Sequence, residues 1–145
     1  MQKKNNVLII ASNYYQKIYD NLLKEASNEI LVNNFLCEVE TVTGVFEIPS
    51  IITFAKNKFD GYIALGCVIR GETTHYDYVC QESARALMNL SLEGLALGYG
   101  IITTENYNQA LARSITGENI EGKGKVAAIA CINQIKLRRK YTYES

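Results

Sequence analysis

The sequence predicts an α/β fold, a three-layer α/β/α sandwich around a four-stranded parallel sheet. Short apolar runs of strand length alternate along the chain with longer segments whose apolar residues recur at helical spacing. The first run, Val7 to Ala11, is apolar throughout, which is typical of a parallel strand covered on both faces. The length of 145 residues suits one domain with one core, so residues 1–145 are expected to form a single domain.

Four segments are expected to be buried strands, and the second of them alternates apolar and polar residues. The strands are predicted at residues 7–11, 37–42, 62–69 and 97–103. Helices are predicted between and after them, at residues 18–30, 48–59, 79–88, 106–113 and 126–139.

Helix starts show their own signals. Pro49 is well placed in a first turn. Thr74 is expected to cap the third helix, with Asp77 as a weak capping-box partner, and Thr104 is expected to cap the fourth.

Composition argues against several classes of protein. The 15 basic and 15 acidic residues balance, which gives no support to binding through nucleic-acid phosphates. The basic cluster at residues 136–140 is expected to complete a helix end, with an RNA-binding module as the weaker alternative. A single His makes a His-rich metal site unexpected. No signal peptide or membrane span is expected.

The cysteines predict a reducing compartment. Cys37, Cys67, Cys80 and Cys131 show neither zinc-knuckle nor CxxC spacing. We expect them to be reduced thiols, most of them in apolar surroundings, in a cytoplasmic protein.

Sites in doubly wound sheets gather at the carboxyl ends of the strands, and the loop after the third strand is the strongest candidate. In residues 70–77 (RGETTHYD), Gly71 permits close backbone approach, and the loop amides with the following helix start predict an anion pocket. His75 beside it is a candidate proton carrier. The alternative is a capped helix with an incidental surface His.

Two further strand ends and two cations are weaker candidates. Phe46 and Glu47 offer a ring face and a hydrogen-bond acceptor, or simply begin a helix. Tyr14 and Tyr15 are placed to stack on a heteroaromatic ligand, or to lie at a subunit interface. Arg113 and Lys123 either sit at helix ends or bind phosphate.

Three blocks together resemble the lumazine synthase family over nearly the whole chain from Val7. They are residues 44–49 (GVFEIP), 66–79 (GCVIRGETTHYDYV) and 99–106 (YGIITTEN), in matching order and separation. The resemblance implies a flavodoxin-like fold and 6,7-dimethyl-8-ribityllumazine synthase activity. That reaction condenses 5-amino-6-ribitylamino-2,4(1H,3H)-pyrimidinedione with 3,4-dihydroxy-2-butanone 4-phosphate, the penultimate step of riboflavin biosynthesis, and needs no metal or redox cofactor.

The resemblance also implies a role for each matching residue. His75 matches the general acid/base. The pyrimidinedione and its ribityl chain are implied to contact Tyr14, Phe46, Glu47, Ile48, Val68, Ile69 and Tyr99. The phosphate is implied to contact Gly71, Glu72, Thr73, Arg113 and Lys123, of which Arg113, like Tyr99 of the first group, comes from a neighbouring subunit. Tyr15 remains the alternative to Tyr14, because the length of this loop varies.

Three departures from the family pattern leave these groups in place: Asn13 stands for Arg, Thr43 for Pro, and Tyr99 for Phe. The segment between Arg113 and Lys123 looks longer than in shell-forming members, which in the family accompanies pentamers, so a homopentamer with sites at its interfaces is expected. The alternatives are an archaeal-type riboflavin synthase and a non-catalytic lumazine- or flavin-binding protein.

Overall fold

A computed structural model describes residues 5–142 and confirms the predicted α/β sandwich. Four parallel strands form one sheet in the order β2-β1-β3-β4. Their bounds are Asn6–Ser12 (β1), Leu36–Val42 (β2), Gly61–Ile69 (β3) and Leu97–Thr104 (β4). The chain winds outward from β1 to β2, then crosses back to β3 and β4, so the order reverses between β1 and β3.

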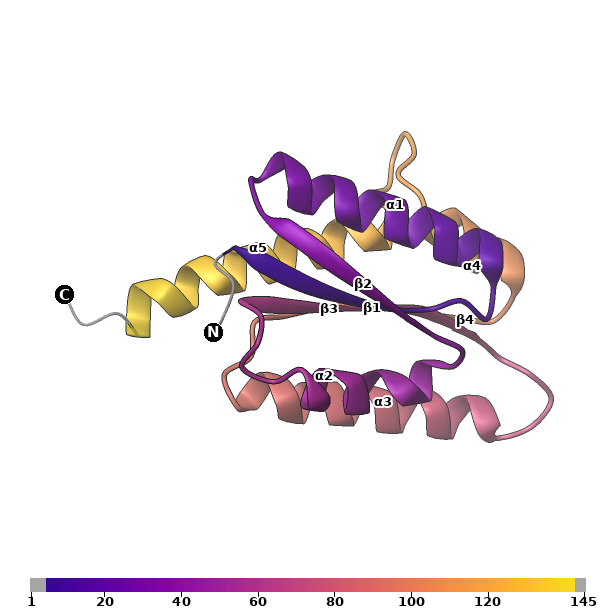
Figure 1. Cartoon of the computed structure of the whole chain (residues 1–145). Coiled ribbons are helices and arrows are strands. Elements are labelled where there is room, and N and C mark those ends of the chain that lie inside the picture. Colours follow the sequence, from indigo (N-terminus) through magenta and orange to yellow (C-terminus); the bar gives the residue numbers. More distant parts are fainter. Residues whose placement is uncertain (1–4, 143–145) are drawn as a thin grey trace.

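Helices cover both faces of the sheet (Figure 1). On one face lie α1 (Gln16–Val32), α4 (Tyr107–Arg113) and α5 (Lys123–Thr142). On the other lie a 3₁₀ turn, η1 (Val45–Glu47), and the helices α2 (Ile48–Phe54) and α3 (His75–Leu92).

The two helical layers bury separate apolar cores against the sheet. Along β1, Val7, Ile9 and Ala11 pack with α1 and α5, while Leu8 and Ile10 pack with α2 and α3. Successive side chains of a strand point to opposite faces, so a continuous apolar run is what a strand between two layers requires. The apolar run that predicted a covered strand therefore lies at the centre of the sheet.

Close packing of α5 against β4 depends on glycine. A Cβ at Gly98 would lie 2.1 Å from the carbonyl oxygen of Ala127, and one at Gly100 would lie 3.0 Å from the Ala127 side chain. Any larger side chain at Gly98 would push α5 away from the sheet. This helix therefore sits on β4 at nearly backbone-to-backbone distance.

The expectation that all four strands are buried is wrong for β2. Leu36 and Val39 are 64% and 40% exposed, and most other residues of this strand are also open. β2 is an edge strand that pairs only with β1, so one of its edges has no neighbouring strand.

Three helix ends also differ from the sequence prediction. α2 stops at Phe54 rather than at residue 59, because the chain turns through Asn57 at φ 67° before β3. Asn106, not Thr104, caps α4, and its side-chain oxygen accepts from the Gln109 amide at 2.9 Å. Thr74 lies at the N-cap of α3 without a side-chain capping hydrogen bond, so the predicted capping box with Asp77 is wrong.

Candidate functional site

A cleft of about 640 Å³ opens at the carboxyl ends of β1, β2 and β3. It lies where the strand order reverses, which is the usual position of a ligand site in an open α/β sheet. Three loops, after β1, β2 and β3, surround it. It is lined by Ser12, Tyr14, Tyr15, Gly44, Val45, Phe46, Glu47, Cys67, Val68, Ile69, Gly71, Thr73, His75, Tyr76, Tyr78 and Val79.

The base of the cleft is held together by close contacts between these strand ends. A Cβ at Gly66 would lie 2.6 Å from Cγ2 of Val45, so the 3₁₀ turn after β2 packs directly on the β3 backbone. The Ser12 hydroxyl donates to the carbonyl of Thr43 at 2.7 Å and ties the end of β1 to the end of β2. The cleft is therefore built on rigid strand ends.

Two adjacent tyrosines after β1 have different environments. The Tyr14 ring is 68% exposed and lies edge-on to the Tyr15 ring at 4.9 Å between centroids. Tyr15 packs against the α1 and α5 core and also contacts Tyr107, and burial raises its pKa above the usual value for tyrosine. Tyr14 thus offers the open ring face, and Tyr15 supports it from behind.

The turn after β2 contributes a second aromatic ring and a carboxylate. Phe46 is 60% exposed and lines the cleft. Glu47 also lines it, and its carboxylate accepts from the Gly44 amide at 2.8 Å, which leaves further acceptor positions on both oxygens. Ile48 does not reach the cleft: its side chain is fully buried and packs in the core under α2.

The loop after β3 places Gly71, Thr73 and His75 along the cleft, whereas the side chain of Glu72 lies outside it. The His75 amide donates to the Thr73 hydroxyl at 3.2 Å. A Cβ at Gly71 would meet no protein atom within 4 Å, so packing does not demand glycine here. A glycine that borders a cleft leaves its backbone amide accessible to a ligand.

His75 is the first residue of α3, at the helix end whose amides have no partner within the helix, and it lines the cleft. Its imidazole can accept a proton at one nitrogen and donate one from the other. Cys67 also lines the cleft, but burial, with a smaller contribution from Cys80, raises the pKa of its thiol to about 12. The cleft thus holds one imidazole, that of His75, and a Cys67 thiol that stays protonated at neutral pH.

Tyr99, Arg113 and Lys123 do not line the cleft of their own chain. Tyr99 is on β4 and faces the α3 side of the sheet, where burial raises its pKa. Arg113 ends α4, and Lys123 begins α5. The segment between them is held on α1, because Glu25 accepts from the Thr116 amide and hydroxyl, both at 2.7 Å.

Sequence reasoning missed the aromatic wall contributed by the first turn of α3. Tyr76, Tyr78 and Val79 line the cleft beside His75. Residues three and four apart share one face of a helix, so the spacing of Tyr78 and Val79 from His75 was the available signal. Ser12, Val45 and Cys67 were also missed; they lie at strand ends and turns.

Among residues 5–142, no three His, Cys, Asp or Glu side chains gather in a way that would hold a metal ion. In the same part of the chain no helix combines the length and apolar character needed to cross a bilayer.

A doubly wound α/β sheet with an aromatic-lined cleft, an exposed glycine-containing loop and one imidazole at the strand ends is typical of an enzyme of the open α/β class. Comparison with known proteins identifies the family. A family model for 6,7-dimethyl-8-ribityllumazine synthase matches residues 4–139. The chain belongs to this family.

Individual relatives agree along nearly their whole length. The chain is 43% identical to the 6,7-dimethyl-8-ribityllumazine synthase of Bartonella tribocorum over 97% of this chain and 95% of the relative. It is 43% identical to that of Zymomonas mobilis over 92% of this chain and 96% of the relative. It is 44% identical to that of Methylorubrum populi over 95% of this chain and 85% of the relative.

Proposed function

We propose that the cleft at the ends of β1, β2 and β3 binds both substrates of lumazine synthesis side by side. Membership of the family makes the chain a lumazine synthase, a transferase of riboflavin biosynthesis. The observation that carries the proposal for the site is the meeting of an exposed tyrosine ring, a loop of accessible amides and the only His of the sequence around one cavity. In this proposal, ring stacking, phosphate binding and proton transfer are each carried out by a different part of the cleft.

The pyrimidinedione ring stacks on Tyr14 in this proposal, with Phe46 as a second wall and Val68 and Ile69 as the apolar base. The exposure of Tyr14 and the packing of Tyr15 against the core favour Tyr14 over its neighbour. Glu47 accepts hydrogen bonds from ribityl hydroxyls or ring N–H groups. Ile48 contributes through its backbone, because its side chain is buried elsewhere.

The phosphate of the butanone substrate is held by backbone amides of Gly71, Glu72 and Thr73 at the start of α3. A helix start carries partial positive charge and free N–H groups, both of which favour an anion. The substrate amine then attacks the ketone carbon beside His75. An imine forms with loss of water, and elimination of phosphate leaves an enol that tautomerises to a ketone. The ribityl-bearing amine attacks that ketone, and loss of a second water closes the new ring.

His75 moves protons between these steps, while much of the rate comes from holding the two substrates in contact. Each step needs a proton taken from nitrogen or carbon and one given to a departing oxygen. One imidazole can do both in turn. The exposed position of His75 at the cleft supports this role.

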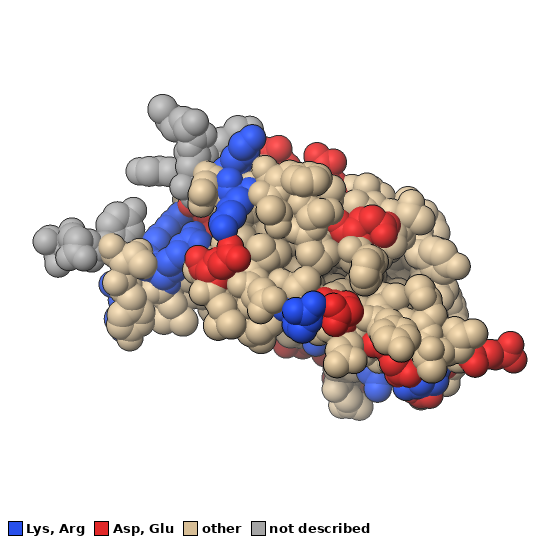
Figure 2. Space-filling model, turned by 90° about the horizontal axis from the view of Figure 1, so that it is seen from below, with Lys and Arg blue, Asp and Glu red and all other residues tan. Residues whose placement is uncertain are grey.

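We infer that Arg113, Lys123 and Tyr99 complete the cleft of an adjacent subunit in a homopentamer. All three lie outside the cleft of their own chain. Large apolar side chains are exposed on several elements, including Phe54, Met88 and Leu92, and the face formed by α2 and α3 shows broad uncharged areas (Figure 2). Extensive exposed apolar surface is typical of a subunit interface. Sedimentation tests the stoichiometry, and a monomer with full activity would contradict it.

The four cysteines support a cytoplasmic location in this proposal, because all are free thiols and reduced thiols are typical of a reducing compartment. Fractionation of cells that carry the tagged protein would test it.

A two-substrate assay tests the function. Lumazine absorbance and released phosphate should rise together, and only when both substrates are present. With lumazine alone no riboflavin should form; its appearance would favour the riboflavin synthase alternative. Ring binding without phosphate release would favour a non-catalytic binding protein.

A further inference from the structure

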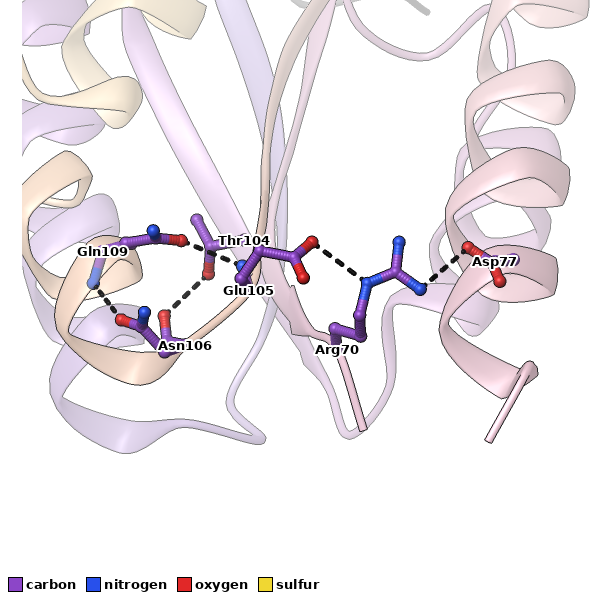
Figure 3. Close-up of polar contacts among 6 residues, drawn as sticks. All are labelled: Arg70, Asp77, Thr104, Glu105, Asn106 and Gln109. Carbon is purple, nitrogen blue, oxygen red and sulfur yellow. Dashed lines mark hydrogen bonds and ion pairs between the residues drawn. The ribbon is translucent and has the colours of Figure 1, made fainter. Parts of the chain in front are cut away.

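Arg70 directly follows the last residue of β3 and immediately precedes the loop of residues 71–74, but its side chain does not line the cleft. Its Nε donates to Oε2 of Glu105 at 3.0 Å, and its Nη1 lies 3.4 Å from Oδ1 of Asp77. Its guanidinium also stacks over the Tyr76 ring at 4.4 Å from the centroid. The Arg70 side chain thus bridges two elements: it contacts Glu105 just after β4 on one side and the first turn of α3 on the other (Figure 3).

The anchor on the β4 side is itself well held. The Arg70 amide donates to the carbonyl of Thr104 at 2.9 Å, which continues the β3–β4 pairing. The Glu105 amide donates to the Gln109 side chain at 3.0 Å, and the Asn106 cap fixes the start of α4 (Figure 3). Glu105 therefore presents its carboxylate to Arg70 from a part of the chain that is fixed by the sheet.

The loop between these anchors is open on its outer side. Residues 71–74 are all exposed, and a Cβ atom placed on Gly71 would meet no protein atom within 4 Å. Arg70, which precedes this loop, contacts Tyr76 and Asp77, which follow it, so the two ends of the loop are held together. The spacing of the loop amides relative to His75 depends on how these two ends are held.

We propose that Arg70 is a positioning residue: through Glu105, Asp77 and Tyr76 it sets the geometry of the phosphate loop and of His75 without touching either substrate. This rests on the proposed function of residues 71–73 and His75. Ion pairs at such exposed side chains add little to global stability, so the effect of Arg70 falls on the loop. The pKa of Arg70 is raised, first by its hydrogen bond to Glu105, in keeping with a guanidinium that stays charged.

The contact set requires arginine. Two carboxylates approach different nitrogens of one planar group whose face lies on a ring. The ammonium of lysine is a compact charge without that plane and cannot make the three contacts together. Arg70→Lys is therefore expected to behave like Arg70→Gln, although it keeps the charge.

The test compares steady-state kinetics of Arg70→Gln, Arg70→Lys and Glu105→Ala with Arg85→Gln as a matched control. Arg85 lies on α3, further along the helix than Asp77, and pairs with Glu82 at 2.6 Å, away from the loop. In the three test variants we expect kcat/KM for the butanone phosphate to fall about ten- to hundredfold, with a higher inhibition constant for inorganic phosphate. The KM for the pyrimidinedione should stay within about twofold, and Arg85→Gln should match the wild type.

The double variant and the two KM values show whether Arg70 positions the phosphate loop. Combining Arg70→Gln with Glu105→Ala should add little to either change alone, because both remove the same anchor. A test variant that retains wild-type phosphate-substrate kinetics, or that raises the KM of both substrates equally, would overturn the proposal. Lack of lumazine formation by the wild type would instead overturn the proposed function, so the two failures are distinguishable. If Arg70→Gln does not fold, Glu105→Ala removes the same contact from the other side.

Discussion

Replacing Tyr14 by Ala should weaken binding of the pyrimidinedione substrate about ten- to thirtyfold. A tyrosine side chain buries about 150–250 Å² when covered. Because 68% of Tyr14 is exposed and a stacked ring covers one of its two faces, a ligand would bury roughly 50–85 Å² of it. At about 25 cal/mol per Å² this contributes about 1.3–2 kcal/mol, which corresponds to the stated change in Kd.

Tyr15 supplies the matched comparison. Tyr15→Ala should lower the free energy of unfolding by about 1–3 kcal/mol, because its ring packs on the core and on Tyr107, whereas Tyr14→Ala should change it by less than about 0.5 kcal/mol. Tyr14→Phe keeps the ring and should bind nearly as the wild type does. Titration calorimetry with the pyrimidinedione and thermal unfolding at fixed protein concentration measure both quantities. Unchanged substrate affinity in Tyr14→Ala would show that the pyrimidinedione ring does not stack on Tyr14.

His75→Ala should lower kcat by about a hundred- to ten-thousandfold but leave product formation above the uncatalysed rate, and complete loss with intact fold and substrate binding would argue that proximity matters less than proposed. Arg113→Ala should raise the KM of the butanone phosphate about tenfold or more through loss of a charge-assisted hydrogen bond, and an unchanged KM would count against its assignment. Burial raises the pKa of Cys131 from 9.0 to about 12, so its thiol ionises first in the unfolded chain, and the stability that it contributes below pH 9 is lost as the pH rises toward 12. Cys131→Ala should therefore reduce the loss of unfolding free energy between pH 8 and pH 10 by about 1.4 kcal/mol in denaturant titrations, and an unchanged pH dependence would show that the thiol ionises equally in both states.

The fold was predictable because burial on both faces leaves a signal in the sequence. The apolar run of β1 and the helical stripe of α1 each reflect a packed surface. The exposure of β2 was not predictable, because Leu36 and Val39 look like core residues in sequence, and only the strand order shows that they lie at an open edge. The cap of α4 failed for a similar reason: Thr104 and Asn106 are both good capping residues, and pairing with β3 extends β4 through Thr104.

The site was predictable where it follows strand ends. Parallel strands bring their carboxyl ends to one edge, so Tyr14, Phe46 and His75 meet although they are far apart in sequence. The contacts of Arg70 were not predictable, because a long side chain at the surface has many possible partners. The position of Glu105 in the sequence does not show which way its carboxylate points. Arg113 and Lys123 were assigned only from the family resemblance, and a single chain cannot bring them to its own cleft.

A structure of the assembled enzyme with the pyrimidinedione substrate and inorganic phosphate bound would show directly whether one cleft holds both groups. We expect phosphate oxygens within hydrogen-bond distance of the amides of residues 71–73, beside the imidazole of His75, with the substrate ring lying flat on Tyr14. Phosphate bound away from that loop, or a ring bound outside the cleft while Tyr14 stays open to solvent, would contradict this expectation.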